Sequence, residues 1–377
     1  MKVKKILVLG HEASLSGAPK LLLELCKDLR RQRFELVIFL KTGGELIGEF
    51  SKLGNIFLLD SLNSSKNIVT KFLARIMPLY RLRDFYLKYK FKKYCPDLIL
   101  NYTLVNSKLF PYVFKLKSPI LTIAQEMKYV IKLFDKLKIN DSKIIFEKTD
   151  HFIACSNAVK NDLVNQFEVN ENKIEVIYNS VSYFISKKMN YTNKKTFYVG
   201  MCGGPIHRKG PDLFLNTAKY INTTYPKEKI KFLWQGGNEN STAFQDFKNE
   251  IELLNLSKCV EIYPNSKDVQ KFFSKLDLFM CSSREEPFGM VILEAGLYNI
   301  PVLAFKKSGG PEEILANGRG LIIPYASYSK MGESIIELKG NKKYRDKFAK
   351  NLNEYSTKNL KENNNLLIIN RIKKLLF

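Results

Sequence analysis

The feature that most constrains the fold is an order of segments that occurs twice along the chain. Residues 5–9 form a short apolar run that ends at Gly10, and a polar loop, a helix-length segment and a second apolar run at 35–40 follow. This order is typical of the opening of a βαβ unit with a parallel sheet. The same order begins again at residues 196–200. The chain is therefore predicted to fold as two doubly wound α/β units.

Length and composition predict the boundary between the two units. The chain has 377 residues, which is too long for one hydrophobic core and suits two domains of ordinary size. A polar, lysine-rich stretch at 186–195 has the composition of a linker. We therefore predict an N-terminal domain over residues 1–183 and a C-terminal domain over residues 184–359.

The net charge is strongly positive. Lys and Arg number 61 against 37 Asp and Glu, which gives a formal charge of +24. Such a charge suits an anionic partner, whether a nucleic acid, a membrane surface or a phosphorylated substrate. A compositional bias explains the excess equally well, because Lys, Asn and Ile are abundant together throughout the chain.

One stretch, residues 71–93, is denser in basic side chains and interleaves them with aromatic ones. Its basic residues are Lys71, Arg75, Arg81, Arg83, Lys88, Lys90, Lys92 and Lys93. A basic, aromatic helix can lie on an anionic membrane surface. It can equally be an ordinary amphipathic helix with a solvated face, and the sequence leaves both interpretations open.

The six cysteines stand singly, without a Cys-x-x-Cys pair. This spacing argues against a disulfide framework or a zinc site and fits a reducing compartment. The first residues carry lysines and a short apolar run but no small-residue cleavage site, and no segment reaches transmembrane length. We therefore expect a cytoplasmic protein, which the basic segment can hold at the inner face of the membrane.

Residues 282–296 carry the most informative motif. They follow an apolar run that ends at Cys281, and Pro287 suits the first turn of a helix. A helix N-terminus binds anions through backbone N–H groups that lack a partner within the helix. The residues expected to present these groups are Phe288, Gly289, Met290 and Val291. The segment is therefore a candidate phosphate site.

Two carboxylates accompany this candidate site. Glu286 precedes the predicted helix, at the mouth of the site, and Glu294 lies deeper, about two turns inside the helix. Together they can bind hydroxyl groups at the two ends of an extended ligand, and a sugar and a ribose joined by a diphosphate form such a ligand. A surface helix with a carboxylate favourably placed near its positive end gives the same pattern.

Two adjacent cations, Arg208 and Lys209, stand in a predicted strand-to-helix loop just before Gly210. They can neutralise a diphosphate, and they would act most strongly as negative charge grows on a departing nucleotide. A pair of solvated surface cations is the plainer explanation in a chain with 61 Lys and Arg.

Residues 286–294 strongly resemble the Glu-x7-Glu signature of the family 4 glycosyltransferases, which are retaining enzymes with two Rossmann-like domains in the GT-B fold. The resemblance spans nearly the whole chain. Its other segments, in chain order, are 14–18, 151–156, 200–210 and 309–314. The first resembles the family's glycine-rich loop, the third ends in its Lys-Gly, and the last resembles its Gly-Gly-x-x-Glu-Ile turn.

The resemblance implies a GT-B architecture, in which two Rossmann-like domains face each other across a cleft and a C-terminal helix, about 360–377, returns to the N-terminal domain. It implies sugar transfer from a nucleotide-diphosphate sugar to a hydroxyl of a polysaccharide, glycolipid or other cell-surface glycan precursor, without a cofactor. The catalytic residues it implies are Arg208, Lys209 and Glu286. The substrate-binding residues it implies are Gly17, Gln125, Phe288, Gly289, Met290, Val291 and Glu294.

Two positions depart from the family pattern. Many relatives carry an arginine near Gly203, so Arg208 is expected to supply more of the phosphate contact here. Gln125 stands where relatives often carry a histidine, and an amide can hold a sugar hydroxyl by hydrogen bonds but cannot take a proton. Among the histidines, His11 can reach the cleft and His207 can line the phosphate pocket.

No Asp-x-Asp motif stands where a divalent ion would bridge donor phosphates, so we predict metal independence. The family implies retention at the anomeric carbon, with a leaving phosphate oxygen helping to deprotonate the acceptor. A sugar-nucleotide epimerase or sugar phosphorylase of GT-B fold is the nearest alternative. A dehydrogenase is disfavoured because no Gly-x-Gly-x-x-Gly follows either first strand. We expect no nucleic acid partner, because no known module pattern occurs, and the basic segment favours a lipid-linked acceptor.

Overall fold

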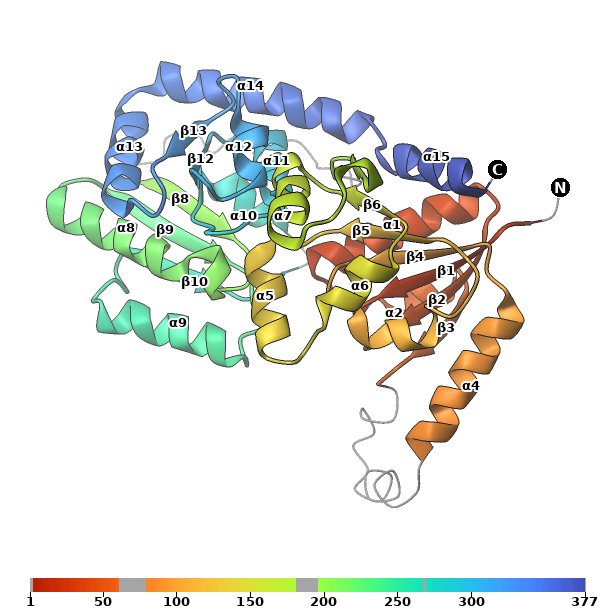
Figure 1. Ribbon diagram of the computed structural model, residues 1–377. Coiled ribbons are helices and arrows are strands. Elements are labelled where there is room, and N and C mark those ends of the chain that lie inside the picture. The colour runs from red at the N-terminus through yellow and green to blue at the C-terminus, as the bar shows by residue number, and fades with distance from the viewer. Residues whose placement is uncertain (1–2, 61–78, 181–195, 267–268, 377) are drawn as a thin grey trace. The chain divides into compact units, whose positions relative to one another are not determined.

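The chain folds as two compact α/β units (Figure 1). The residues that the computed structural model describes are 3–60, 79–180, 196–266 and 269–376. Unit 1 comprises Met1–Asn179 and Asn364–Phe377, and unit 2 comprises Ser180–Asn363. The predicted linker at 186–195 and the first part of the basic segment, residues 71–78, lie outside the described residues.

The described residues of unit 1 form a seven-stranded sheet in which neighbouring strands are parallel. In sheet order its strands are β3 (Asn55–Leu58), β2 (Glu35–Leu40), β1 (Lys5–Gly10), β4 (Leu98–Tyr102), β5 (Ile120–Ala124), β6 (His151–Ala154) and β7 (Ile174–Val176). Its helices are α1 (Gly17–Arg31), α2 (Ile47–Ser51), α4 (Leu79–Tyr94), α5 (Lys128–Lys136), α6 (Ser142–Lys148), α7 (Asn157–Phe167) and α15 (Asn365–Leu376), with short 3-10 turns η1 (Ser107–Tyr112) and η2 (Glu171–Lys173). The strand order reverses between β1 and β4, which makes this pair the topological switch point of the unit.

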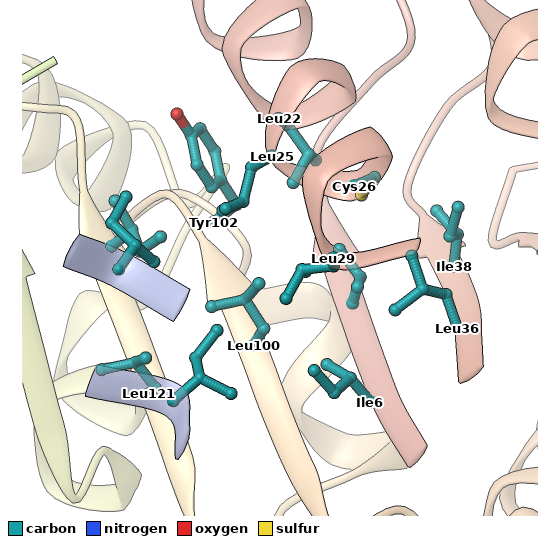
Figure 2. Packing of buried hydrophobic residues seen from close by; sticks show 14 of the residues in the cluster. Ile6, Leu22, Leu25, Cys26, Leu29, Leu36, Ile38, Leu100, Tyr102 and Leu121 are labelled. Carbon is teal, nitrogen blue, oxygen red and sulfur yellow. The ribbon is translucent and has the colours of Figure 1, made fainter. Parts of the chain in front are cut away.

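One core of unit 1 lies between the sheet and helices α1 and α15. Alternate residues of a strand point to the same face of a sheet, so the even-numbered residues of β1 face α1. Figure 2 shows Leu25 and Leu29 of α1 beside strand residues such as Ile6 and Leu100. The residues that α15 adds to this core are Ile368, Ile369 and Ile372. The C-terminal helix is therefore an integral part of unit 1.

Unit 2 repeats the same design with six parallel strands among its described residues. In sheet order they are β10 (Val260–Tyr263), β9 (Ile230–Gln235), β8 (Phe197–Cys202), β11 (Leu278–Cys281), β12 (Val302–Phe305) and β13 (Leu321–Ile323). Its helices are α8 (Pro211–Thr224), α9 (Thr242–Leu253), α10 (Val269–Lys275), α11 (Met290–Leu297), α12 (Gly310–Leu315), α13 (Tyr328–Gly340) and α14 (Lys342–Lys361), with a 3-10 turn η3 (His207–Lys209). The switch point lies between β8 and β11. The predicted fold class, two Rossmann-like doubly wound units, is confirmed.

Helix α11 is held from outside by α14. A Cβ on Gly296 would lie 2.8 Å from the Cγ of Leu352, so the glycine lets the two helices approach closely. The side-chain amide of Asn353 donates to the carbonyl oxygen of Gly296 at 2.9 Å. This contact fixes the position of the helix that follows β11.

In the part of the chain that the structure describes, no helix is both long enough and apolar enough to cross a membrane.

Candidate functional site

Most of the candidate site residues lie in unit 2, at the carboxyl ends of β8 and β11. Strand β8 leads through a glycine turn into η3, which carries Arg208 and Lys209, and then into α8. Strand β11 leads through residues 282–289, which include Glu286, into α11. Because β8 and β11 are neighbours at the switch point, their loops meet. Open α/β sheets bind ligands at this place.

A buried ion pair is the centre of the site. The ammonium group of Lys209 donates a hydrogen bond to the Oε2 atom of Glu286, and the two residues are only 8% and 7% exposed. The hydroxyl of Ser283 donates to the same oxygen at 3.2 Å. A guanidinium nitrogen of Arg208 lies 4.0 Å from it. Two cations and a hydroxyl therefore converge on one carboxylate oxygen.

These neighbours decide the charge of the carboxylate. Burial alone raises the pKa of Glu286, but the charges of Lys209 and Arg208 and the hydrogen bonds from Lys209 and Ser283 outweigh it, so the pKa lies below its ordinary value. Glu286 is therefore ionised at neutral pH. Its negative charge partly neutralises Lys209 and Arg208, the two cations that we predicted from the sequence to bind a diphosphate.

A glycine turn after β12 holds the backbone of Glu286. The N–H of Glu286 donates to the carbonyl of Ser308 at 2.7 Å, and the N–H of Gly310 donates to the carbonyl of Glu286 at 2.9 Å. Gly309 has a φ of +107°, in the region that favours glycine. A Cβ on Gly310 would lie 2.4 Å from the carbonyl oxygen of Phe288. The Gly-Gly turn thus sets the position of the catalytic candidate Glu286.

A second set of contacts joins the loop after β8 to the loop after β11. The N–H groups of Arg284 and Glu285 donate to the carbonyl of Arg208 at 2.8 and 3.3 Å. The guanidinium of Arg284 forms a bidentate pair with Asp212, at 2.7 and 2.5 Å, in the first turn of α8. The hydroxyl of Ser282 donates to the carbonyl of Lys209 at 2.8 Å. The two loops therefore form one hydrogen-bonded assembly.

The prediction that Pro287 begins the next helix is wrong. Helix α11 begins at Met290, and its N-cap is Gly289 with a φ of +104°. Pro287 lies in the bend before it. The positive φ of Gly289 turns the chain sharply into the helix, and the residues from Pro287 to Gly289 stay outside it. Of the four predicted N–H donors, Met290 and Val291 lie in the first helical turn, whereas Phe288 and Gly289 precede it.

The burial of the two glutamates is the reverse of the expected one. Glu294 is the fifth residue of α11 and is half-buried, whereas Glu286 is buried more deeply. The loop bends inward beneath the Gly309–Gly310 turn, and this places Glu286 inside rather than at the mouth.

Among the described residues, no group of three or more His, Cys, Asp or Glu side chains is placed to hold a metal ion.

Two substrate-binding candidates lie in unit 1. The side-chain amide of Gln125 is paired reciprocally with that of Asn179, at 3.1 and 2.9 Å, and also donates to the hydroxyl of Tyr102 at 3.3 Å. Both ends of this amide are therefore engaged within unit 1. Gly17 is the first residue of α1 and is exposed, and a Cβ there would meet no atom within 4 Å. Packing within unit 1 does not require a glycine at this position.

Sequence reasoning missed a polar cluster at the switch point of unit 1. Glu12 follows β1 and accepts hydrogen bonds from the hydroxyls of Ser14, at 2.6 Å, and Ser16, at 3.2 Å. Nε2 of His11 lies 3.4 Å from the same carboxylate. The contact with His11 is the largest effect on Glu12, and with the two hydroxyls it outweighs burial and lowers the pKa of Glu12 to about 2. The spacing of Ser14 and Ser16, two and four residues after Glu12, is the sequence signal that could have indicated the cluster.

Comparisons with known proteins show what each part of the chain resembles. A family model described as glycosyl transferases group 1 matches residues 184–355, and one described as glycosyltransferase family 4 matches residues 15–183. A crystal structure of Alr3699/HepE from Anabaena, in complex with UDP and glucose, superposes with a TM-score of 0.79 at 18% identity. That superposition covers 98% of this chain and 99% of the other.

Two curated relatives match over part of their length. An uncharacterized 41.2 kDa protein in the cps region of Klebsiella pneumoniae is 27% identical over 206 residues, 52% of this chain and 54% of the relative. The capsular polysaccharide biosynthesis glycosyltransferase CapM of Staphylococcus aureus is 22% identical over 235 residues, 59% of each chain. The matches thus span little more than half the length of these relatives.

The fold and the two family matches, which together cover most of the chain, define the class of protein: the chain has the GT-B fold of glycosyltransferases. Within that class, it belongs to the family 4 type, with a group 1 glycosyltransferase domain at residues 184–355.

Proposed function

We propose that this chain transfers a sugar from a nucleoside-diphosphate sugar to a hydroxyl group of a polysaccharide, glycolipid or other cell-surface glycan precursor. The observation that carries the proposal is the buried Lys209–Glu286 pair, with Arg208 beside it, at the switch point of unit 2. The UDP and glucose in the HepE complex support a sugar nucleotide as donor. The name of CapM supports a surface polysaccharide as product.

The cations provide the electrostatic part of the proposed reaction. When the bond between the sugar and the diphosphate breaks, negative charge grows on the leaving phosphate oxygen. Lys209 is buried, and Arg208 and the first residues of α11 are half-buried. Groups held in fixed, partly desolvated positions stabilise such charge more than solvated groups would. Glu286 keeps the ammonium of Lys209 in place and can accept hydrogen bonds from sugar hydroxyls. Glu294, half-buried on α11, can accept them from the ribose.

We further propose that the reaction retains the configuration of the anomeric carbon and needs no metal ion. The bond from the anomeric carbon to the diphosphate breaks, a bond to the acceptor oxygen forms on the same face, and the acceptor proton passes to the leaving phosphate oxygen. The protein then need not supply a strong base. The amide of Gln125, which cannot take a proton, is compatible with this route.

The test is a transfer assay of the full chain with a panel of nucleoside-diphosphate sugars and glycan or lipid-linked acceptors. Lys209→Ala and Glu286→Ala are expected to lower turnover by a factor of roughly 10²–10³ each, because each removes a preorganised charge. Lys219→Ala, on the exposed side of α8, is the matched control and should leave turnover unchanged.

Wild-type rates in both site variants would contradict the assignment. Anomeric configuration of the product, read by proton NMR, tests retention. Product formed without an acceptor would identify an epimerase instead, and product formed only with inorganic phosphate would identify a phosphorylase.

A further inference from the structure

Helix α4 carries large apolar side chains on two opposite faces. Its inner face packs on the sheet of unit 1, where Leu87 and Phe91 are buried. The ring of Phe91 lies 4.9 Å from that of Phe39 on β2 and 5.4 Å from that of Phe57 on β3, measured between centroids. These contacts supply the ordinary core face of an amphipathic helix.

Polar contacts fix the rotation of α4 about its axis. A guanidinium nitrogen of Arg83 donates to the carbonyl of Leu59 at 2.7 Å. The hydroxyl of Tyr112 donates to the carboxylate of Asp84 at 2.7 Å. The hydroxyl of Tyr94, near the end of the helix, donates to the carbonyl of Glu35 at 3.0 Å. The helix therefore cannot turn its other face inward without breaking all three bonds.

The opposite face is a stripe of exposed apolar and aromatic side chains. Leu82, Phe85, Tyr86 and Tyr89 are 63, 73, 49 and 53% exposed, respectively. Their spacing of three, four and seven residues places them on one side of a helix. We call these four residues the outer stripe. Single exposed apolar residues are normal on protein surfaces, but a contiguous exposed apolar patch marks an interaction site.

Basic side chains border the outer stripe. At 100° per residue, Arg81, Lys88 and Lys92 follow one edge of the stripe, Lys90 the other, and Lys93 continues it toward the end of the helix. Helix α4 has six basic residues and one acidic residue. The acidic residue is Asp84, which is bound on the inner side to Tyr112 and Arg83. The outer face of the described helix thus presents cations and no carboxylate.

We propose that the outer stripe of α4 docks on an anionic membrane surface, with its aromatic rings at the headgroup boundary and its lysines on lipid phosphates. Aromatic rings prefer this boundary, and basic side chains beside them are attracted to anionic lipids. A second copy of the chain suits the surface less well, because two such helices would bring like charges face to face. The proposal is independent of sugar transfer, since α4 lies in unit 1 and the candidate donor site lies in unit 2.

The test is co-sedimentation of the full chain with vesicles of phosphatidylcholine alone or of phosphatidylcholine and phosphatidylglycerol in equal parts. The wild-type chain should bind the mixed vesicles at low salt, bind the neutral vesicles at least about tenfold more weakly, and be released by salt. The double variant Phe85→Ser, Tyr89→Ser should bind the mixed vesicles at least about tenfold more weakly, because it removes two rings from the lipid contact.

Two matched controls separate docking from general charge and surface chemistry. Lys88→Ala, Lys92→Ala, Lys93→Ala should weaken binding about as strongly as the ring variant, whereas Lys342→Ala, Lys343→Ala, Lys347→Ala on α14 should have a much smaller effect. Tyr325→Ser, Tyr328→Ser, also at exposed positions, should change nothing.

Equal loss in the α4 and α14 lysine variants, or unchanged binding in the ring variant, would overturn the proposal. So would a wild-type dimer in solution that the ring variant dissociates while vesicle binding is absent. Circular dichroism and nucleoside-diphosphate binding should match the wild type in all variants, so that failure of docking is distinguishable from failure of the donor site.

Discussion

Opposite effects on nucleotide binding are expected from the two halves of the buried ion pair. In the ligand-free chain, Glu286 occupies the ammonium of Lys209. A bound diphosphate must share that ammonium with the carboxylate. Lys209→Met removes a cation from the diphosphate, whereas Glu286→Gln removes a competitor and leaves an amide oxygen that still holds Lys209 in place. The first variant should bind a nucleoside diphosphate more weakly, and the second as tightly as the wild type or more tightly.

The structure gives the size of these effects. A hydrogen bond between charged groups contributes about 1.5–3 kcal/mol, so Lys209→Met should raise the Kd of the nucleoside diphosphate by roughly 10- to 100-fold. Two unit charges about 4 Å apart interact by roughly 4 kcal/mol at an effective dielectric constant of about 20. Glu286→Gln makes only part of this attraction available for diphosphate binding, because Arg208 and Ser283 also contact the carboxylate. We expect the Kd to fall by up to about tenfold, or about 1.4 kcal/mol.

Both variants should lower the thermal stability and the turnover of the chain. Removing one partner of a buried ion pair lowers the free energy of unfolding by about 3–5 kcal/mol when the other partner is left alone. The loss should be smaller here, because Arg208 and Ser283 also contact the Glu286 carboxylate. Isothermal titration calorimetry with the nucleoside diphosphate alone gives the Kd without a contribution from sugar contacts. Lys219→Met is the matched control. Equal weakening in Glu286→Gln and Lys209→Met would refute the competition and would place Glu286 in direct contact with the nucleotide.

Three further predictions concern the Gly309–Gly310 turn, the Glu12 cluster of unit 1 and the role of metal ions. Gly310→Ala should destabilise unit 2 by about 1–3 kcal/mol and lower turnover, because its Cβ would lie 2.4 Å from the Phe288 carbonyl and displace the Glu286 loop; wild-type melting and rates would contradict this. The pKa of Glu12 is lowered to about 2, so its contribution to the stability of unit 1 should be present above about pH 4.5 and be lost as the pH falls toward 2. Acid unfolding of Glu12→Gln beside the wild type measures this contribution, and equal unfolding midpoints would refute it. Sugar transfer should persist in excess chelator, and a complete loss that added metal reverses would refute metal independence.

Local patterns in the sequence predict the architecture of both units. Each strand is a short apolar run and each first loop carries a glycine, and these signals depend only on neighbouring residues. The family pattern likewise identifies Arg208, Lys209 and Glu286, which come together because β8 and β11 are adjacent in the sheet. What sequence order cannot give is the burial of Glu286, because the Gly309–Gly310 turn that encloses it comes from a different strand.

Contacts between distant residues explain the other differences. The sequence does not reveal that Asn179, which lies 54 residues after Gln125, pairs with both ends of its amide; the role of Gln125 in sugar binding stays a prediction. Helix α11 begins later than expected because Gly289 has a positive φ, and the residues beside it in the sequence do not predict that value. The apolar residues of α4 gave no clear single face in the sequence, since one set packs on the sheet and the other is exposed.

The most direct test of the account is an experimental structure of the full chain with a bound nucleoside diphosphate. We predict that the diphosphate lies at the carboxyl ends of β8 and β11, within hydrogen-bonding distance of Arg208, Lys209 and the first N–H groups of α11. A diphosphate bound elsewhere, with the Lys209–Glu286 pair closed and without contact to it, would contradict the account.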